Sequence, residues 1–216
     1  MRAVRDAVAQ GELDVVVPDE ALVFSRGDGV FESPVALRLG IEPRVVAERV
    51  GGTVTGAGFV RVAVSARDVV DAILGDPEYG VAKVPERQWD EWPRTFENPG
   101  FSVRYAYARA CWVGRWAEDL RLQRGPLDDA RPEELRLVGV LGDVPGRARQ
   151  AERERDARPL MFCLERVAGA YHDVHERCPA IGPGTARAGR VGLAEAVRVV
   201  LGNGLNMIGE TPRERI

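Results

Sequence analysis

The sequence predicts a small α+β domain followed by an all-α helical bundle. Residues 59–64, Phe-Val-Arg-Val-Ala-Val, alternate as a half-buried strand does, within an N-terminal part made of short apolar runs. Near the C-terminus apolar residues instead recur at steps of three, four and one, which is typical of a helix with one buried face: Leu193, Val197, Val200, Leu201, Leu205 and Ile208. Three prolines between these two parts argue against a long helix there. We therefore expect a domain at 1–75, a linker at 76–97 and a second domain at 98–216.

Turn and cap residues divide the N-terminal domain into short elements. Pro34 and Pro43 can each begin a helix, because proline is tolerated in the first helical turn. Ser65 can cap a third helix. The expected helices are 2–10, 34–39, 43–50 and 66–74, and the expected strands are 14–17, 21–24 and 59–64.

Helical periodicity covers most of the C-terminal domain. The expected helices are 98–122, 132–144, 159–177 and 186–208, with 146–157 as a charged helix end or a connector. Gly209 is suited to cap the end of the last helix, and Pro212 prevents its continuation. An aromatic stripe at helical spacing in the first of these helices is more often core than surface, so we assign Phe101, Trp112 and Trp116 mainly to packing.

The composition is that of a soluble, cytoplasmic protein. Of the 216 residues, 45% are hydrophobic and 29% are charged, which is ordinary for a globular chain. No run of about 18 apolar residues and no signal peptide is apparent in the sequence. Three cysteines without a Cys-x-x-Cys spacing indicate a reducing compartment.

Charge is distributed unevenly between the two halves of the chain. Residues 1–97 hold 11 basic and 17 acidic side chains, a balance of −6, and residues 98–216 hold the other 19 basic and 16 acidic ones, a balance of +3. A polyanion should therefore favour the C-terminal half, although the excess is small.

The sequence offers no catalytic or metal-binding constellation. Both histidines, His172 and His175, lie three residues apart in one expected helix without further ligands at matching spacing, so we interpret them as a polar surface pair. The lone Lys83 has no phosphate-binding loop beside it. We expect no enzyme activity, no cofactor and no metal ion.

Two stretches of the C-terminal domain carry a family resemblance. Residues 98–109 read Asn-Pro-Gly-Phe-Ser-Val-Arg-Tyr-Ala-Tyr-Ala-Arg, and residues 195–198 read Glu-Ala-Val-Arg. Both resemble the DALR anticodon-binding domain of arginyl-tRNA synthetases, with Arg104 and Tyr107 replacing the usual Gln and His. The chain resembles such a synthetase reduced to its tRNA-binding ends, because the His-x-x-His signature and Lys-Ser loop of the catalytic domain are missing.

The N-terminal domain is similar to the N-terminal additional domain of the same synthetases. The matching residues are Gly29-Val-Phe-Glu-Ser-Pro34, Pro43-Arg44 and Gly56-Ala-Gly-Phe59, with Val30 and Pro34 in place of the family's Asp and Asn. In the family this stretch contacts the outer corner of tRNA. The resemblance implies that Phe31 keeps a part of that contact and that the two replacements weaken or alter it.

The resemblance also implies which residues meet the anticodon loop. Tyr171 and His175 project together at i and i+4, and flat rings suit the splayed bases of a single-stranded loop. The tRNA-binding residues that we expect are Asn98, Arg104, Tyr105, Arg109, Tyr171, His175, Arg198, Ile216 and Phe31. For Arg198 a structural ion pair is equally compatible with the sequence.

The function that follows is a non-catalytic tRNA-binding protein, which holds the anticodon loop of a tRNA resembling tRNA-Arg. It would act as an adaptor, presenter or competitor for an enzyme that modifies or consumes tRNA. Two rivals stay open: a non-catalytic subunit of an arginine–tRNA ligase-like assembly, and a protein-interaction module that has lost RNA binding.

Overall fold

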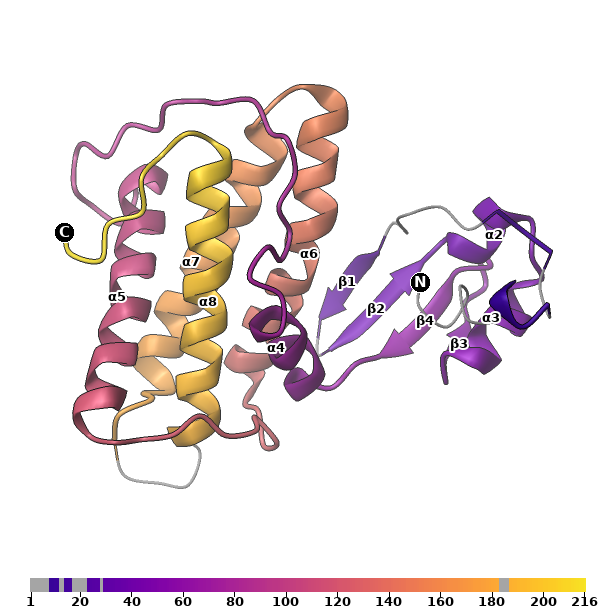
Figure 1. Ribbon diagram of the computed structural model, residues 1–216, viewed down its shortest axis with the longest axis horizontal. Helices are drawn as coiled ribbons and strands as arrows, with labels where there is room; N and C mark the ends of the chain where they lie inside the picture. Colours follow the sequence, from indigo (N-terminus) through magenta and orange to yellow (C-terminus); the bar gives the residue numbers. More distant parts are fainter. Residues whose placement is uncertain (1–7, 12–13, 17–22, 28, 183–186) are drawn as a thin grey trace. The chain divides into compact units, whose positions relative to one another are not determined.

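The computed structural model describes residues 8–11, 14–16, 23–27, 29–182 and 187–216 (Figure 1). The chain divides into two compact units, Met1–Val64 and Ser65–Ile216. The first unit is α+β and the second consists of helices and irregular segments, as the sequence predicted.

The first unit contains a four-stranded antiparallel sheet with the strand order β1-β2-β4-β3. Its strands are β1 (Phe24–Gly27), β2 (Val30–Ser33), β3 (Thr53–Val54) and β4 (Val60–Ala63), and its helices are α2 (Val35–Leu39) and α3 (Pro43–Arg49). Val60 packs with apolar side chains of both helices and forms the core of this unit. On β2, Glu32 is buried and accepts hydrogen bonds from Arg26 at 2.7 Å and from Arg61 at 2.6 Å.

The sequence located these helices well but not all the strands. β2 and β3 were not expected as strands, and residues 14–16 form no strand although they belong to the expected strand 14–17. The expected strand 21–24 overlaps β1 only at Phe24. Residues 1–7, and with them most of the expected helix 2–10, lie outside the described residues.

The second unit is built around four long helices. They are α5 (Pro99–Asp119), α6 (Pro132–Glu154), α7 (Arg158–Arg177) and α8 (Arg187–Met207), and the short α4 (Ala66–Leu74) precedes them. The helices α6 and α7 pack side by side, and α5 lies against both α7 and α8 (Figure 1). Buried Glu134 joins α6 to α8 through a 2.7 Å ion pair with Arg190. Gly209, with φ of 82°, follows the last helix as the sequence predicted.

Two boundaries differ from the expected ones. The helix expected at 132–144 continues through Pro145 to Glu154, so 146–157 is largely a helix end and not a connector. Buried alanines and valines on both sides of Pro145 keep α6 packed on α7, and tertiary packing outweighs the single hydrogen bond that proline removes. The division between the units falls after Val64 and not at residue 75, because the buried face of α4 packs on α8 and α6.

The segment expected to be a linker is an ordered part of the helical unit. It contains no helix or strand between residues 76 and 97, as its prolines predict. Its backbone is nevertheless bound along α8 and the chain beyond it: Asn203 donates to the carbonyl oxygen of Pro77 at 2.9 Å, and Arg87 N–H donates to that of Ile208 at 2.9 Å. We call residues 76–97 the strap.

Candidate nucleic-acid interface

The helix α5 presents a half-exposed aromatic stripe. Phe101, Tyr105 and Arg109 follow one another at steps of four, and Trp112 and Trp116 continue the same face. The opposite face is buried and consists largely of small residues such as Val103, Ala106 and Ala110. The prediction that Trp112 and Trp116 serve mainly in packing is wrong, since 44% and 46% of their surfaces are exposed.

The N-terminal part of this stripe belongs to a group of side chains that we call the aromatic cluster. It is formed by Phe96, Phe101, Tyr105, Arg109 and His172. Phe101 and Tyr105 are stacked with their ring centroids 5.5 Å apart and their planes inclined by 13°. Phe96, from the strap, meets Tyr105 edge-on at 5.6 Å and His172 of α7 at 5.0 Å. The Arg109 guanidinium lies 4.6 Å from the centroid of the Tyr105 ring. The cluster therefore combines four flat rings with one cation.

His172 is held as a neutral acceptor for Arg109. Its Nε2 lies 3.2 Å from the carbonyl oxygen of Ser102 and its Nδ1 lies 3.2 Å from Nη1 of Arg109. Because guanidinium only donates, Nδ1 accepts and Nε2 carries the proton. Burial, and next the positive charge of Arg109, lower the pKa of His172 to about 4. The expectation of a polar surface pair with His175 is therefore wrong for His172, which is part of the cluster.

The Tyr171–His175 pair does not form the platform that was expected. The two ring centroids are 6.1 Å apart, but Tyr171 is only 2% exposed, so its ring faces the core of the bundle. Its hydroxyl makes no hydrogen bond within the described residues, and burial raises its pKa. His175 stays half-buried, and burial followed by the charge of Arg109 lowers its pKa as well. Only His175 of this pair remains available at the surface.

Arg104 and Phe31 are also buried, against the prediction. Arg104 is 3% exposed. Its guanidinium pairs with Glu210 at 2.5 Å and donates to the carbonyl oxygens of Gly100 and Trp89. Phe31 is 8% exposed and lies opposite Val62 on the core side of the sheet. Neither side chain is presented to a binding partner.

Three further predicted residues lie outside the stripe. Asn98 caps α5 and accepts a hydrogen bond from Phe101 N–H at 3.1 Å, so its side chain is engaged in the helix start. Arg198 is half-exposed and lies 3.8 Å from Glu195, which agrees with the structural alternative for this residue. Ile216 is 42% exposed at the end of a tail that Glu214 joins to Arg115 of α5.

Sequence reasoning missed Phe96 and the exposure of the two tryptophans. Phe96 has no periodic signal because it lies in an irregular segment, and it is 52% exposed. The spacing of Phe101, Tyr105 and Arg109 at i, i+4 and i+8 was the signal that could have grouped these three.

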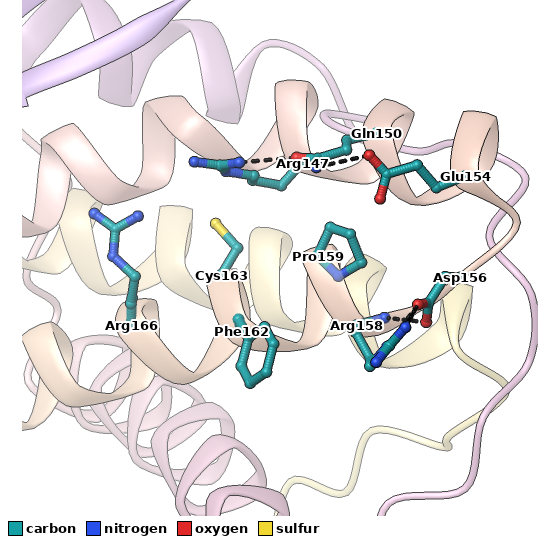
Figure 2. A pocket seen from close by; sticks show the side chains of 9 residues that line it. All are labelled: Arg147, Gln150, Glu154, Asp156, Arg158, Pro159, Phe162, Cys163 and Arg166. Atoms are coloured by element: carbon teal, nitrogen blue, oxygen red, sulfur yellow. Dashed lines mark hydrogen bonds and ion pairs between the residues drawn. The ribbon is translucent and has the colours of Figure 1, made fainter.

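A hollow of the helical unit lies between α6 and α7, with a volume of about 460 Å³ (Figure 2). Arg147 donates to Gln150 there at 2.8 Å, and Arg158 is paired with Asp156 at 2.5 Å. Phe162 lines it and is 60% exposed. Since its cations are largely occupied by neighbouring side chains, this hollow is a weaker candidate for an anion than the cluster.

The described residues hold no group of three or more His, Cys, Asp or Glu side chains suited to a metal ion. Among them, no helix has the length and apolarity that crossing a bilayer requires.

Comparison with known proteins identifies the family of the helical unit. The family model described as the DALR anticodon binding domain matches residues 103–216, more than half of the chain. The arginine–tRNA ligase of Clavibacter sepedonicus is 34% identical over 131 residues, and that of Frankia alni is 35% identical over 133 residues. Each match covers 57% of this chain but 24% of the ligase, so the chain spans about a quarter of the length of these curated relatives.

Solved structures show the same fold. The arginyl-tRNA synthetase of Thermus thermophilus superposes with a TM-score of 0.51 at 26% identity, over 56% of this chain and 22% of the synthetase. A putative arginyl-tRNA synthetase of Campylobacter jejuni has a TM-score of 0.52 at 16% identity, over 59% of this chain and 28% of that one, and shows the fold alone. The family model matched over residues 103–216, together with the shared helical fold, shows that this chain belongs to the DALR anticodon binding domain family.

Proposed function

We propose that this protein is a non-catalytic tRNA-binding protein that holds the anticodon loop on the aromatic cluster. The observation that carries the proposal is the Arg109 guanidinium lying over the Tyr105 ring, beside the rings of Phe96 and His172. Unstacked bases of a loop bind to such rings, and each stack contributes on the order of 1–3 kcal/mol. The guanidinium adds a partner for the phosphate backbone.

The proposed role of the complex is to direct a tRNA without changing it chemically. The comparisons match the tRNA-binding part of arginine–tRNA ligases, and the resemblance points to a tRNA similar to tRNA-Arg. Such a protein acts as an adaptor or presenter for an enzyme that uses tRNA, or competes with a synthetase for it. Within this proposal the setting is the cytoplasm, where translation takes place.

Sequencing the RNA that co-purifies with the tagged protein tests the proposal. We expect tRNA to be enriched, and we expect the Tyr105→Ala/Arg109→Ala double variant to lose that enrichment. The Phe162→Ala variant serves as a control, because this exposed ring lies outside the cluster. Equal recovery of tRNA by all three proteins, or no enrichment with any of them, contradicts the proposal.

A protein-interaction module is the second candidate, and one observation favours it. Trp112 and Trp116 of α5 and Leu120, which caps its C-terminus, follow at steps of four, and 44%, 46% and 55% of their surfaces are exposed. Large exposed apolar ridges often mark protein interfaces. If the Trp112→Ala/Trp116→Ala variant keeps tRNA binding but loses a co-purifying protein, this apolar ridge binds a partner protein and is separate from the RNA site. A third role, as a non-catalytic subunit of an arginine–tRNA ligase-like assembly, predicts that this partner binds ATP.

A further inference from the structure

We infer that the strap forms one wall of the nucleotide site, and that Arg104 is the positioning residue that holds its Phe96 there. This inference rests on the proposed function, because it concerns how a base is held on the aromatic cluster. It gives a role to a segment that was predicted to be a linker. It also changes the role of Arg104 from contacting RNA to positioning Phe96.

Phe96 is the most exposed ring of the aromatic cluster. It is 52% exposed, whereas Phe101, Tyr105 and His172 are half-buried between α5 and α7. Its ring is edge-on to the Tyr105 ring and the His172 ring, and the Arg109 guanidinium lies 5.7 Å from its centroid. A base that lies on the exposed surface of the aromatic cluster would therefore meet the Phe96 ring.

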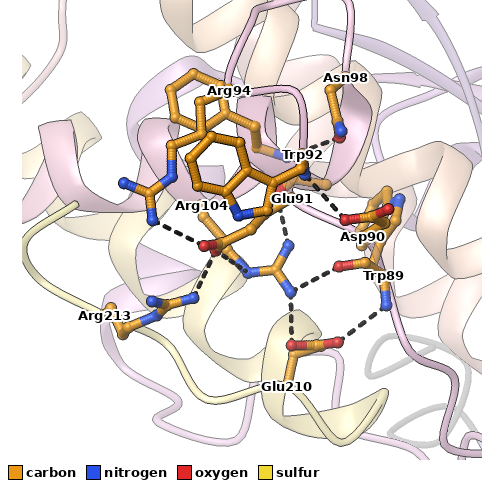
Figure 3. Close-up of polar contacts among 11 residues, drawn as sticks. Trp89, Asp90, Glu91, Trp92, Arg94, Asn98, Arg104, Glu210 and Arg213 are labelled. Carbon is orange, nitrogen blue, oxygen red and sulfur yellow. Dashed lines mark hydrogen bonds and ion pairs between the residues drawn. The ribbon is translucent and has the colours of Figure 1, made fainter.

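The backbone around Phe96 belongs to no helix or strand, so its position depends on the contacts of the strap with the rest of the helical unit. Arg104 lies beside Tyr105 in the sequence, but on the buried side of α5. Its Nη2 donates to the carbonyl oxygen of Trp89 at 3.0 Å and to Glu210 at 2.5 Å (Figure 3). Glu210 in turn accepts from Trp89 N–H at 2.9 Å. Arg104 thus connects α5, the strap and the C-terminal tail.

A second group of charged side chains holds the strap next to Trp89. Glu91 of the strap lies 3.7 Å from Nε of Arg104, 2.5 Å from Arg213 and 2.9 Å from Arg94 (Figure 3). Nε of Arg104 is buried and has no hydrogen bond among the described residues, so its charge is balanced mainly by Glu91 and Glu210.

The first turn of α5 leaves room for the strap. A methyl group added to Gly100 would overlap the carbonyl oxygen of Asp90, so the strap backbone passes directly over this turn. The absence of a side chain at Gly100 and the guanidinium of Arg104 together fix the strap at Asp90 and Trp89, six and seven residues before Phe96. On the other side, Asn98 N–H donates to the carbonyl oxygen of Thr95 at 3.1 Å. Phe96 is therefore positioned from both directions.

The test is a double-mutant cycle measured as the affinity for an anticodon stem-loop hairpin of tRNA-Arg. We expect Phe96→Ala to weaken binding by about tenfold, as the loss of one stack does. Phe162→Ala removes a ring of similar exposure outside the cluster, and we expect less than about a twofold change from it.

Arg104→Gln should weaken binding about as much as Phe96→Ala, and should add nothing when Phe96 is already alanine. Glu210→Gln, which keeps the size of the side chain, provides the same test if Arg104→Gln folds poorly. Arg115→Gln removes another arginine that binds the C-terminal tail but not the strap, and should leave affinity unchanged. All variants are measured where circular dichroism shows them fully folded.

Fluorescent 2-aminopurine, placed at each loop position in turn, gives a readout that a purely structural role would not change. We expect Phe96→Ala and Arg104→Gln to relieve quenching at the same loop position. If the wild-type protein does not bind the hairpin, the proposed function fails. If it binds but Phe96→Ala behaves like Phe162→Ala, the inference alone is overturned, and additive losses for Arg104→Gln and Phe96→Ala overturn the positioning role.

Discussion

The Arg109 guanidinium lies 4.6 Å from the centroid of the Tyr105 ring, one helical turn along the same face of α5. This arrangement places a cation on a ring that is itself half-exposed. We propose these two residues as a binding surface, whereas Arg104, directly before Tyr105, and Tyr107, between the two, are buried.

Replacing Tyr105 by alanine removes the ring at the centre of the aromatic cluster. We expect the affinity for the anticodon hairpin to fall by about tenfold, because Tyr105 stacks on Phe101 and supports both Phe96 and Arg109. Fluorescence anisotropy titration measures this change. Tyr105→Phe keeps the ring and should bind within about twofold of wild type; a loss as large as that of alanine would show that the hydroxyl and not the ring matters.

Replacing Arg109 by alanine should change how binding depends on salt. A guanidinium that contacts a phosphate of a single strand contributes about 0.7 to the slope of log K against log salt concentration. We therefore expect the slope to become shallower by about this amount, whereas Arg166→Ala on the other side of α7 should leave it unchanged. Identical slopes for wild type and Arg109→Ala would exclude a phosphate contact at Arg109.

The low pKa of His172 predicts a pH dependence of stability. The folded protein binds the proton with a pKa of about 4, against an ordinary value of 6.5, so the unfolded chain binds more protons between these limits. The contribution of His172 is therefore fully present above about pH 6.5 and is lost as the pH falls toward 4. Arg109, His175, Glu176 and Ser102 are the groups that the structure gives as acting on this ring.

Urea unfolding at several pH values measures this contribution. We expect wild type to lose more stability than His172→Gln between about pH 6.5 and 4. Carboxylates with a lowered pKa, such as Glu91 and Asp156, also cause a loss of stability at acid pH, and this loss is the same in both proteins. Parallel curves for the two proteins would show that His172 does not titrate in this way.

Tyr171→Phe tests the buried hydroxyl that makes no hydrogen bond within the described residues. A buried unpaired polar group costs on the order of 1–3 kcal/mol, so its removal should raise the free energy of unfolding by about 1 kcal/mol. Hairpin affinity should stay unchanged because the ring is 2% exposed. A destabilised Tyr171→Phe protein would indicate that the hydroxyl has a partner in solution.

Much of the fold could be predicted from local pattern. The spacing of Leu193, Val197 and Val200 specified α8, and Ser65 caps α4 by accepting from Asp68 N–H at 3.0 Å. The extent of α6 could not be predicted in this way, because Pro145 is a local signal against helix that packing on α7 overrides. Two-residue β3 likewise depends on pairing with β4 and has little signal of its own.

The candidate site was predicted only in part, for a physical reason. The helix α5 is apolar on both faces, so periodicity alone does not decide whether Phe101 and Tyr105 or Val103 and Ala106 are buried. Tyr105, Arg109 and His175 are partly exposed and stay candidates for tRNA contact, whereas Tyr171 is buried. Phe96 joins the cluster through the fold of the strap, which depends on long-range contacts with Glu210 that no sequence window contains.

The most direct test of the account compares two RNA hairpins that share one stem. One carries the anticodon loop of tRNA-Arg and the other a compact tetraloop, and the dissociation constants are measured between about 50 and 200 mM salt. If the aromatic cluster holds unstacked bases, the anticodon hairpin binds at least about tenfold more tightly, and its affinity falls as salt is added. Equal affinity for both hairpins, or binding that does not respond to salt, would contradict the central claim.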